Sequence, residues 1–222
     1  MASVDVLEKP WRRIRSFVYR PGRLTPAQQK ALDVHLPRYA FDPHAPWPLD
    51  QAMIMEIGFG NGQALVSMAQ AQPDAHVIGV EVHPPGVGRL LNALADEEIH
   101  NVSVAMRDAV DVLEQEIPEH GLDEVRIYFP DPWPKKRHHK RRLIQPEFVA
   151  LLASRIKEGG RLHLATDWMP YAEWMEEVMG QAPEFKREKE ATHIRPDTHF
   201  QRRGERKGHS IVDMIYQRQA VV

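Results

Sequence analysis

From residue 52 onward, short apolar segments alternate with segments of helical pattern, and this alternation limits the chain to few architectures. Strands that alternate with helices predict an open, mostly parallel α/β sheet with helices on both faces. Residues 210–216 are again strand-like, and no helical pattern separates them from residues 185–187, which favours a terminal antiparallel hairpin and brings the sheet to seven strands. The other predicted strands are 53–57, 76–81, 102–106, 125–129 and 161–166, and the predicted helices are 63–72, 85–98, 110–116, 146–157 and one from residue 170.

The first fifty residues do not follow this alternation. Thr25-Pro26-Ala27-Gln28 has the residues of a capping box with Pro at the first helical position, which predicts a helix running to about Leu36. Prolines between residues 41 and 50 then indicate a semi-rigid connector. We therefore expect a basic N-terminal arm over residues 1–50, with one helix and a Pro-rich connector, and an α/β domain over residues 51–222.

Composition excludes several classes of protein. The chain has no cysteine, so disulfides, Cys-zinc sites and thiol chemistry are excluded. It has no run of about 18 apolar residues and no apolar segment of a secretory signal near its first residue, so we expect a cytoplasmic protein without a membrane partner. Its histidines form no H-x-x-x-H pair on a predicted helix, so we expect no metal.

The net charge of −2 hides a strong segregation of charge along the chain. Three basic segments, residues 9–23, 135–142 and 186–209, together hold 20 of the 29 Lys and Arg residues and only 4 of the 31 acids. An acidic body with three basic patches is typical of a globular protein that binds a polyanion such as nucleic acid. Each patch alone is also typical of solvated surface.

Acidic side chains stand at the ends of three successive predicted strands. Glu56 precedes the glycine-rich turn 58–62, Glu81 ends the second strand, and Asp108 follows the third. In an open parallel sheet, ligands bind outside the carboxyl ends of the strands, where glycines allow close approach and a carboxylate can accept both hydroxyls of a ribose. Each acid alone is also typical of a helix cap, but their shared register indicates a binding site. The candidate cofactor-binding residues here are Glu56, Gly58, Gly60, Gly62, Glu81, Asp108 and Ala109.

The residues around the glycine turn favour S-adenosylmethionine over NAD. The NAD fingerprint needs glycines spaced G-x-G-x-x-G, and here the third glycine comes one residue early, with Gln63 in the expected place. No P-loop lysine or arginine accompanies the glycines. A pocket lined by carboxylates suits the positive sulfonium and ammonium groups of S-adenosylmethionine, whereas the negative pyrophosphate of NAD would bind better in a less acidic pocket.

The fourth predicted strand leads into a proline-rich loop, Phe129-Pro130-Asp131-Pro132-Trp133-Pro134. The prolines stiffen this loop and hold Asp131 and Trp133 at the edge of the sheet. A carboxylate beside an aromatic ring is typical of a purine clamp, in which the acid accepts N–H groups of guanine and the ring stacks; the alternative is a turn with a core Trp. The basic run that follows supplies candidate RNA-contacting residues, or else a solvated loop: Arg137, His138, His139, Lys140, Arg141 and Arg142.

Together these segments resemble the bacterial tRNA (guanine-N7)-methyltransferase family, which has a Rossmann-like class I S-adenosylmethionine-dependent methyltransferase fold. The resemblance covers about residues 15–218, and its most specific motif is Pro-Asp-Pro-Trp-Pro-Lys-Lys-Arg-His at 130–138. It implies methyl transfer from S-adenosylmethionine to N7 of the variable-loop guanosine at tRNA position 46, with tRNA as the partner and no protein partner required. It also includes residues 15–17, 22–23, 56–62, 79–83, 107–109, 166–167 and 198–204.

The resemblance also implies roles for individual residues. Asp131 is the implied catalytic residue and, with Glu56, Glu81 and Asp108, a cofactor contact. The family's usual Thr-Lys-Phe-Glu segment is Thr-His-Phe-Gln in this chain, so Gln201 offers an amide in place of an acid. The implied substrate-binding residues are Lys135, Asp167, Thr198, His199, Phe200 and Gln201.

The expected chemistry follows from the nucleophile. Guanine N7 has a lone pair and carries no proton, so its methylation needs no general base, and catalysis is expected to rest on positioning and on Asp131 near the developing positive charge. Three other functions stay open. The glycine spacing disfavours a dinucleotide-dependent oxidoreductase. The strand-end acids disfavour a non-catalytic RNA-binding module. The basic loop at residues 135–142 disfavours a methyltransferase that acts on small molecules or proteins.

Overall fold

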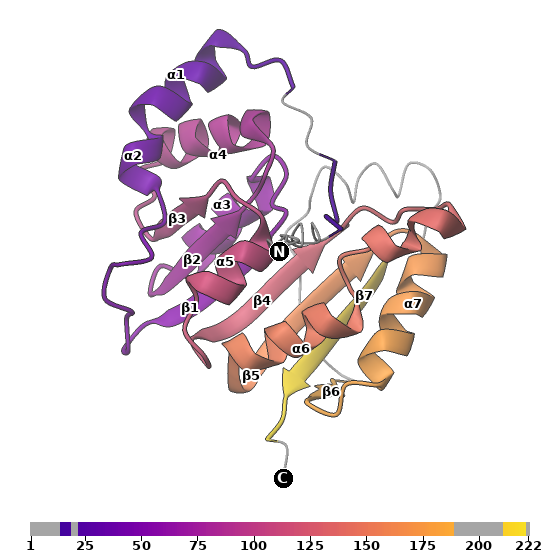
Figure 1. Cartoon of the computed structure of the whole chain (residues 1–222). Coiled ribbons are helices and arrows are strands. Elements are labelled where there is room, and N and C mark those ends of the chain that lie inside the picture. The colour runs from indigo at the N-terminus through magenta and orange to yellow at the C-terminus, as the bar shows by residue number, and fades with distance from the viewer. Residues whose placement is uncertain (1–13, 19–21, 189–210, 221–222) are drawn as a thin grey trace, which may run out of the picture.

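The computed structural model describes residues 14–18, 22–188 and 211–220. Its strands are β1 (Ala52–Ile57), β2 (Ala75–Val80), β3 (Val102–Ala105), β4 (Leu122–Tyr128), β5 (Ile156–Thr166), β6 (Phe185–Arg187) and β7 (Val212–Arg218). They form one sheet in the order β3-β2-β1-β4-β5-β7-β6 (Figure 1). The first five strands are parallel, and β7 is antiparallel to both of its neighbours. The predicted sheet and its terminal antiparallel pair are thus confirmed.

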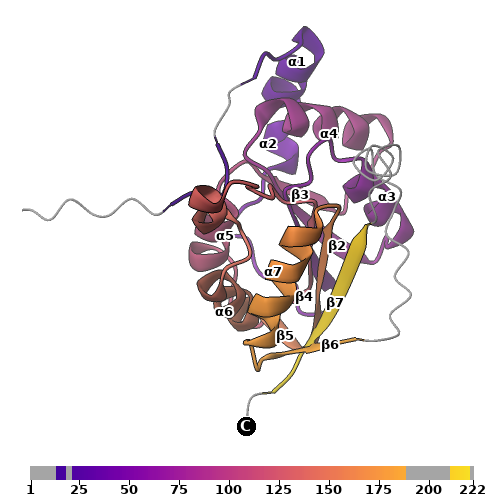
Figure 2. The same cartoon turned by 90° about the vertical axis from the view of Figure 1, so that its right-hand side faces the viewer.

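Helices cover both faces of the sheet (Figures 1 and 2). On one face, Val77 and Val104 of the sheet share a buried apolar cluster with Leu65 and Leu90. On the other face, Met55 belongs to a second buried cluster that includes residues of the last three helices. The first face carries α1 (Pro26–Val34), α2 (Leu36–Tyr39), α3 (Gln63–Ala71) and α4 (Pro84–Asp96), and the second carries α5 (Ala109–Gln115), α6 (Pro146–Arg155) and α7 (Met169–Gly180).

The order of the strands determines where a ligand can bind. From β1 the chain moves outward to β2 and β3 and then returns to place β4 on the other side of β1. The crossover connections therefore leave β1 and β4 in opposite directions, which opens a crevice at the carboxyl ends of these strands. The loops after β1, β2, β3 and β4 all lie at this edge of the sheet.

The chain differs from the prediction where α6 meets β5. The predicted helix through residue 157 ends at Arg155, and the strand begins directly at Ile156. Residues 158–160, predicted as a turn that ends the helix, instead lie inside the strand, where Gly159 has a φ of 77°. There the register between β4 and β5 shifts, which is the signature of a β-bulge.

The described part of the N-terminal arm packs onto the rest of the molecule. The predicted capping box is confirmed, since Thr25 and Gln28 each accept a hydrogen bond from the other's backbone N–H. The predicted helix ends at Val34, and a second short helix begins at Leu36 with Pro37 in its first turn. The Tyr39 hydroxyl donates to the carbonyl of Leu94 at 3.1 Å. The boundary at residue 50 stays a prediction.

None of the helices described is long and apolar enough to cross a membrane. In the same residues, no three His, Cys, Asp or Glu side chains are grouped so as to hold a metal ion.

Candidate active site

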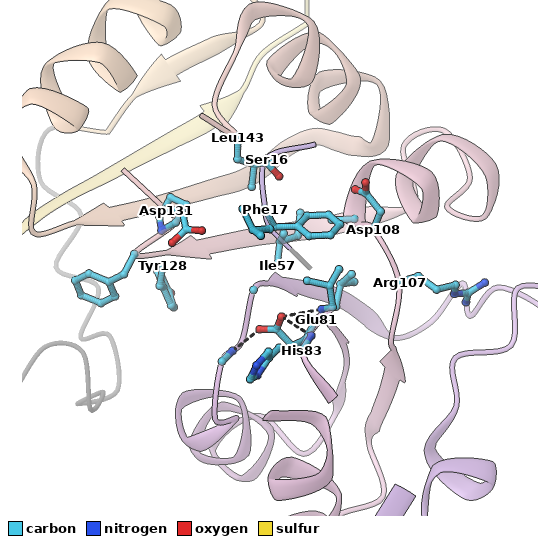
Figure 3. A pocket seen from close by; sticks show the side chains of 18 residues that line it. Ser16, Phe17, Ile57, Glu81, His83, Arg107, Asp108, Tyr128, Asp131 and Leu143 are labelled. Carbon is cyan, nitrogen blue, oxygen red and sulfur yellow. Dashed lines mark hydrogen bonds between the residues drawn. The ribbon is translucent and has the colours of Figure 1, made fainter. Parts of the chain in front are cut away.

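A cavity of about 300 Å³ opens at the carboxyl ends of β1, β2 and β4 (Figure 3). Parallel strands end at one edge of a sheet, so loops far apart in the sequence meet there. The structure brings together most of the predicted cofactor-binding residues and the implied catalytic residue. Those that line the cavity are Gly58, Gly60, Glu81, Asp108, Ala109 and Asp131.

The glycine turn after β1 has a left-handed backbone. Gly58, Gly60 and Gly62 have φ values of 75°, 59° and 79°, which residues with a Cβ adopt only at a cost. A Cβ on Gly58 would meet no atom within 4 Å, whereas one on Gly62 would lie 2.7 Å from the side chain of Leu90. Gly62 caps α3 and does not line the cavity. The glycine at 62 is therefore explained by the packing of α3 against α4.

Glu81 connects the end of β2 to the glycine turn. Its carboxylate accepts hydrogen bonds from the backbone N–H groups of Gly60 at 3.0 Å, Val82 at 2.7 Å and His83 at 3.0 Å (Figure 3). Burial raises the pKa of Glu81, and these hydrogen bonds oppose the rise. The backbone thus holds this carboxylate in one position in the cavity wall.

Glu56 is buried and is not part of the cavity wall. It is 3% exposed, and its Oε2 has no hydrogen-bond partner among the described residues. Burial raises the pKa of Glu56 to about 7; the positive charge of Arg126 opposes this rise and the negative charge of Glu81 adds to it. The next residues, Ile57 and Gly58, do line the cavity. A buried carboxylate oxygen without a partner is costly, so this position favours a proton or a ligand that satisfies it.

Asp108 combines two roles that the sequence offered as alternatives. Its side chain accepts a hydrogen bond from the backbone N–H of Val110 at 3.1 Å and so caps α5. The same residue and Ala109 line the cavity. The cap fixes the carboxylate at the cavity and does not remove it from the site.

The loop after β4 is held in a strained conformation around Asp131. Phe129 and Trp133 have φ values of 52° and 45°, in the left-handed region that bulky residues rarely adopt. The backbone N–H of Phe129 donates to the carbonyl of Ala165 at 2.8 Å, which anchors the start of the loop to β5. Asp131 is exposed and faces the cavity (Figure 3). Strain of this kind persists where the surroundings impose it and is frequent at active sites.

Trp133 is occupied by protein neighbours. Its Nε1 donates to the carbonyl of Ser16 at 2.9 Å. The Arg141 guanidinium lies 5.1 Å from the centre of its ring, and the His138 ring meets it edge to face at 5.6 Å. Trp133 therefore ties the N-terminal segment to the loop, and the stacking role predicted for its ring is not supported by this arrangement.

The basic run after this loop forms a short 3-10 helix, η1 (Lys136–Arg141), with no buried residue. Arg142 differs from the prediction that it is available to RNA, because it is only 4% exposed. Its Nε donates to the carbonyl of Pro132 at 3.1 Å, and its guanidinium lies 4.9 Å from the centre of the Tyr171 ring. Arg142 is thus an internal anchor of the loop. The exposed or half-exposed members of the run are Arg137, His138, His139, Lys140 and Arg141.

The implied substrate-binding residues are only partly described. Lys135 is exposed, next to η1, and Asp167 follows β5 at the same edge of the sheet as the cavity. Neither lines the cavity itself. Thr198, His199, Phe200 and Gln201 lie outside the described residues.

The structure adds site residues that sequence reasoning missed. Ser16, Phe17 and Val18 line the cavity from the N-terminal segment; the resemblance included residues 15–17 but implied no role for them. A Cβ on Gly86 would lie 2.1 Å from the carbonyl oxygen of Gly60, so the first turn of α4 supports the glycine turn directly. A glycine inside a predicted helix was the available signal for this contact.

Comparisons with solved structures identify the fold. The 16S rRNA methyltransferase KamB is 15% identical, with a TM-score of 0.55 over 94% of this chain and 99% of that one. An rRNA methylase from Streptococcus thermophilus is 14% identical, with a TM-score of 0.52 over 90% of this chain and 100% of that one. The sheet is therefore that of a class I methyltransferase.

Comparisons of sequence identify the family. The family model described as "Putative methyltransferase" matches residues 50–214. The tRNA (guanine-N(7)-)-methyltransferase of Xanthomonas axonopodis pv. citri (strain 306) is 50% identical over 96% of this chain and 86% of its own length. The protein of the same name from Pseudomonas syringae pv. syringae (strain B728a) is 46% identical over 95% of this chain and 92% of its own length. The chain belongs to the tRNA (guanine-N7)-methyltransferase family.

Proposed function

We propose that this chain transfers the methyl group of S-adenosylmethionine to N7 of the variable-loop guanosine at position 46 of tRNA, in the cytoplasm. The observation that carries the proposal is the cavity in which Glu81, Asp108 and Asp131 converge from three different strand ends, directly beside the basic loop. The family to which the chain belongs supplies the class of substrate.

The residues of the cavity fit S-adenosylmethionine. Glu81 is held where it can accept both ribose hydroxyls, and Asp108 and Ala109 lie where an adenine can be bound beside them. Glu56 does not line the cavity but is buried directly behind Ile57 and Gly58, which do, and its unpartnered oxygen suits the ammonium group of the amino-acid part. When bound, the cofactor supplies an electrophilic methyl group on a positively charged sulfur.

The residues of the chain then act mainly by position and charge. Since guanine N7 has a free lone pair, no side chain needs to remove a proton. Asp131, on its strained loop at the cavity, accepts hydrogen bonds from the guanine edge and lies near the positive charge that develops on the base. The loop holds this carboxylate in place before the base arrives, so little reorganisation accompanies the reaction.

The basic loop supports this reaction by binding the RNA backbone. A guanosine inside folded tRNA must be exposed before it can enter the cavity, at a cost of about a few kcal/mol. Arg137 and Lys140, both exposed on η1, can bind phosphates beside the cavity and offset that cost.

Methyl transfer from labelled S-adenosylmethionine to unmodified tRNA, followed by mapping of the modified nucleoside, tests the proposal. We expect 7-methylguanosine at position 46, and no label in a matched transcript with adenosine at that position. Label in another nucleoside, or equal labelling of the two transcripts, would contradict the proposed target.

A further inference from the structure

A row of buried charged side chains lies under the cavity, and the reaction derived above uses only part of it. Arg126 of β4 is the register partner of Glu56 of β1, so the two side chains lie on the same face of adjacent strands. The Arg126 guanidinium donates to both carboxylate oxygens of Glu124, at 2.6 Å and 3.0 Å. Its remaining nitrogen contacts the sulfur of Met68 in α3. These contacts hold Arg126 in one orientation.

This arrangement leaves Glu56 beside a positive charge with one oxygen unused. Each nitrogen of the Arg126 guanidinium already has a partner in Glu124 or Met68. No hydrogen bond joins Arg126 to Glu56 Oε2, which has no partner in the described part of the chain. Arg126, itself 5% exposed, therefore acts on Glu56 through charge alone.

We propose that Arg126 is a positioning residue for cofactor binding: its charge holds the Glu56 carboxylate ionised while its own hydrogen bonds go elsewhere, so Glu56 keeps an oxygen for the α-ammonium group of the cofactor. The inference rests on the proposed function, because it takes Glu56 as a cofactor contact. It adds a role for a residue that does not line the cavity.

Other charged groups around Glu56 act in both directions. Glu81, at the end of β2, raises the pKa of Glu56, and Glu124 on β4 partly neutralises Arg126. His83, after β2, lies near Glu81, and the Tyr128 hydroxyl is on the same strand as Arg126. From α3, the described contact is the sulfur of Met68. Arg126 is therefore the positive charge that lowers the pKa of Glu56 against burial and Glu81.

The sign of the pH effect follows from this balance. A cationic ligand favours the ionised form of Glu56, so affinity is complete above the pKa of Glu56 and is lost as the pH falls through about 7. Loss of the positive charge at Arg126 raises this pKa, which moves the loss of affinity to higher pH.

The test is a calorimetric titration of the whole chain with S-adenosylmethionine, without RNA, between pH 6 and pH 8. The double variant Glu124→Gln/Arg126→Gln removes the positive charge without leaving an unpaired buried one. If the pKa of Glu56 rises by about one, affinity falls about fivefold at pH 7 and less than about twofold at pH 8. Arg126→Lys keeps the charge and is expected to stay within about twofold of the wild type at both pH values.

Two controls separate this role from a structural one. Adding the double substitution to Glu56→Gln should have no pH-dependent effect, because the group that titrates is gone. 5′-Methylthioadenosine lacks the ammonium group, so its affinity should not show the pH-dependent difference between wild type and double variant.

A loss of affinity of the same size at every pH, or one that persists in Glu56→Gln, would overturn the inference. If the double variant does not fold, Arg126→Lys decides alone: a wild-type pH profile supports the inference, and a shifted midpoint overturns it. Failure of the wild type to bind S-adenosylmethionine at all would instead contradict the proposed cofactor site.

Discussion

The acidic wall of the cavity (Glu81 and Asp108) and the basic loop (residues 135–142) are built by opposite means. In the acidic wall, backbone N–H groups and burial hold each carboxylate: Glu81 accepts three backbone hydrogen bonds, and Asp108 caps α5. In the basic loop, the charges lie on a short exposed helix, and Arg142 is the buried member. A few fixed charges give geometry, whereas many exposed charges give attraction that tolerates the loss of any one of them.

The largest effect is expected at Asp131, where the two regions meet. Asp131→Ala should lower the single-turnover methylation rate about 100-fold or more, because the lost interaction grows as positive charge develops on the base. Cofactor affinity should change much less. Rapid-quench assays at saturating tRNA, with calorimetry of cofactor binding, measure the two effects. Asp131→Asn keeps hydrogen bonding without the charge, so its methylation rate should lie between those of the wild type and Asp131→Ala. Equal rates for the wild type and both variants would show that the carboxylate has only a structural role.

The next effect concerns the buried member of the basic loop. Arg142→Met should lower the free energy of unfolding by about 2–3 kcal/mol, because the carbonyl of Pro132 loses a charged donor and the contact with Tyr171 is lost. Arg137→Met, on an exposed side chain of the same loop, should change it by no more than about 0.5 kcal/mol. Urea denaturation measures both. If the two variants are equally stable, Arg142 does not anchor the loop.

Arg142 also shows what sequence can and cannot predict here. Residues 135–142 hold six Lys and Arg side chains that the sequence alone does not distinguish. Arg142 is the buried one because it contacts Pro132 and Tyr171, and Tyr171 belongs to the later helix α7. The strand-end acids were predictable because strand periodicity and glycine turns are local signals, and parallel strands end together.

The strain around Asp131 could not be predicted in the same way. The prolines indicate a stiff loop, but the left-handed backbone of Phe129 and Trp133 is imposed by distant contacts. One of these contacts joins Phe129 to Ala165, and another joins Trp133 to Ser16. The bulge in β5 has a similar origin, because the sequence shows a turn but not the strand that continues through it.

In the acidic wall, substitution of one residue, Glu81, should strongly weaken cofactor binding. Glu81→Ala should weaken the binding of S-adenosylmethionine by roughly 1.5–3 kcal/mol, the scale of a lost hydrogen bond to a charged group. Part of the loss comes from the glycine turn, because Gly60 loses its acceptor. Calorimetric titration without RNA measures the effect. Glu119→Ala, whose side chain is 77% exposed, is the control and should bind normally. Equal affinities would show that Glu81 serves the fold alone.

The smallest effect per residue is expected in the exposed part of the basic loop. Replacing Arg137, Lys140 and Arg141 together by Gln removes three candidate phosphate contacts and leaves the Arg142 anchor in place. If each contact neutralises one phosphate, the slope of log K for tRNA against log salt should flatten by roughly 2–3, at about 0.7–0.9 per contact. This is an upper value, because the Arg141 guanidinium lies over the Trp133 ring and so is partly engaged by the protein.

The same triple variant separates attraction from geometry. Its affinity for S-adenosylmethionine should equal that of the wild type, because none of the three residues lines the cavity. Its methylation rate at saturating tRNA should fall less than its affinity for tRNA, because the proposed function gives the loop the binding of the RNA backbone, Asp131 the positioning of the guanine and the acidic wall the positioning of the cofactor. Filter binding at several salt concentrations, followed by single-turnover assays, measures both quantities. An unchanged salt slope would mean that these three side chains are solvated and do not contact phosphates. The binding of tRNA would then have to be assigned to the other basic segments of the chain, residues 9–23 and 186–209.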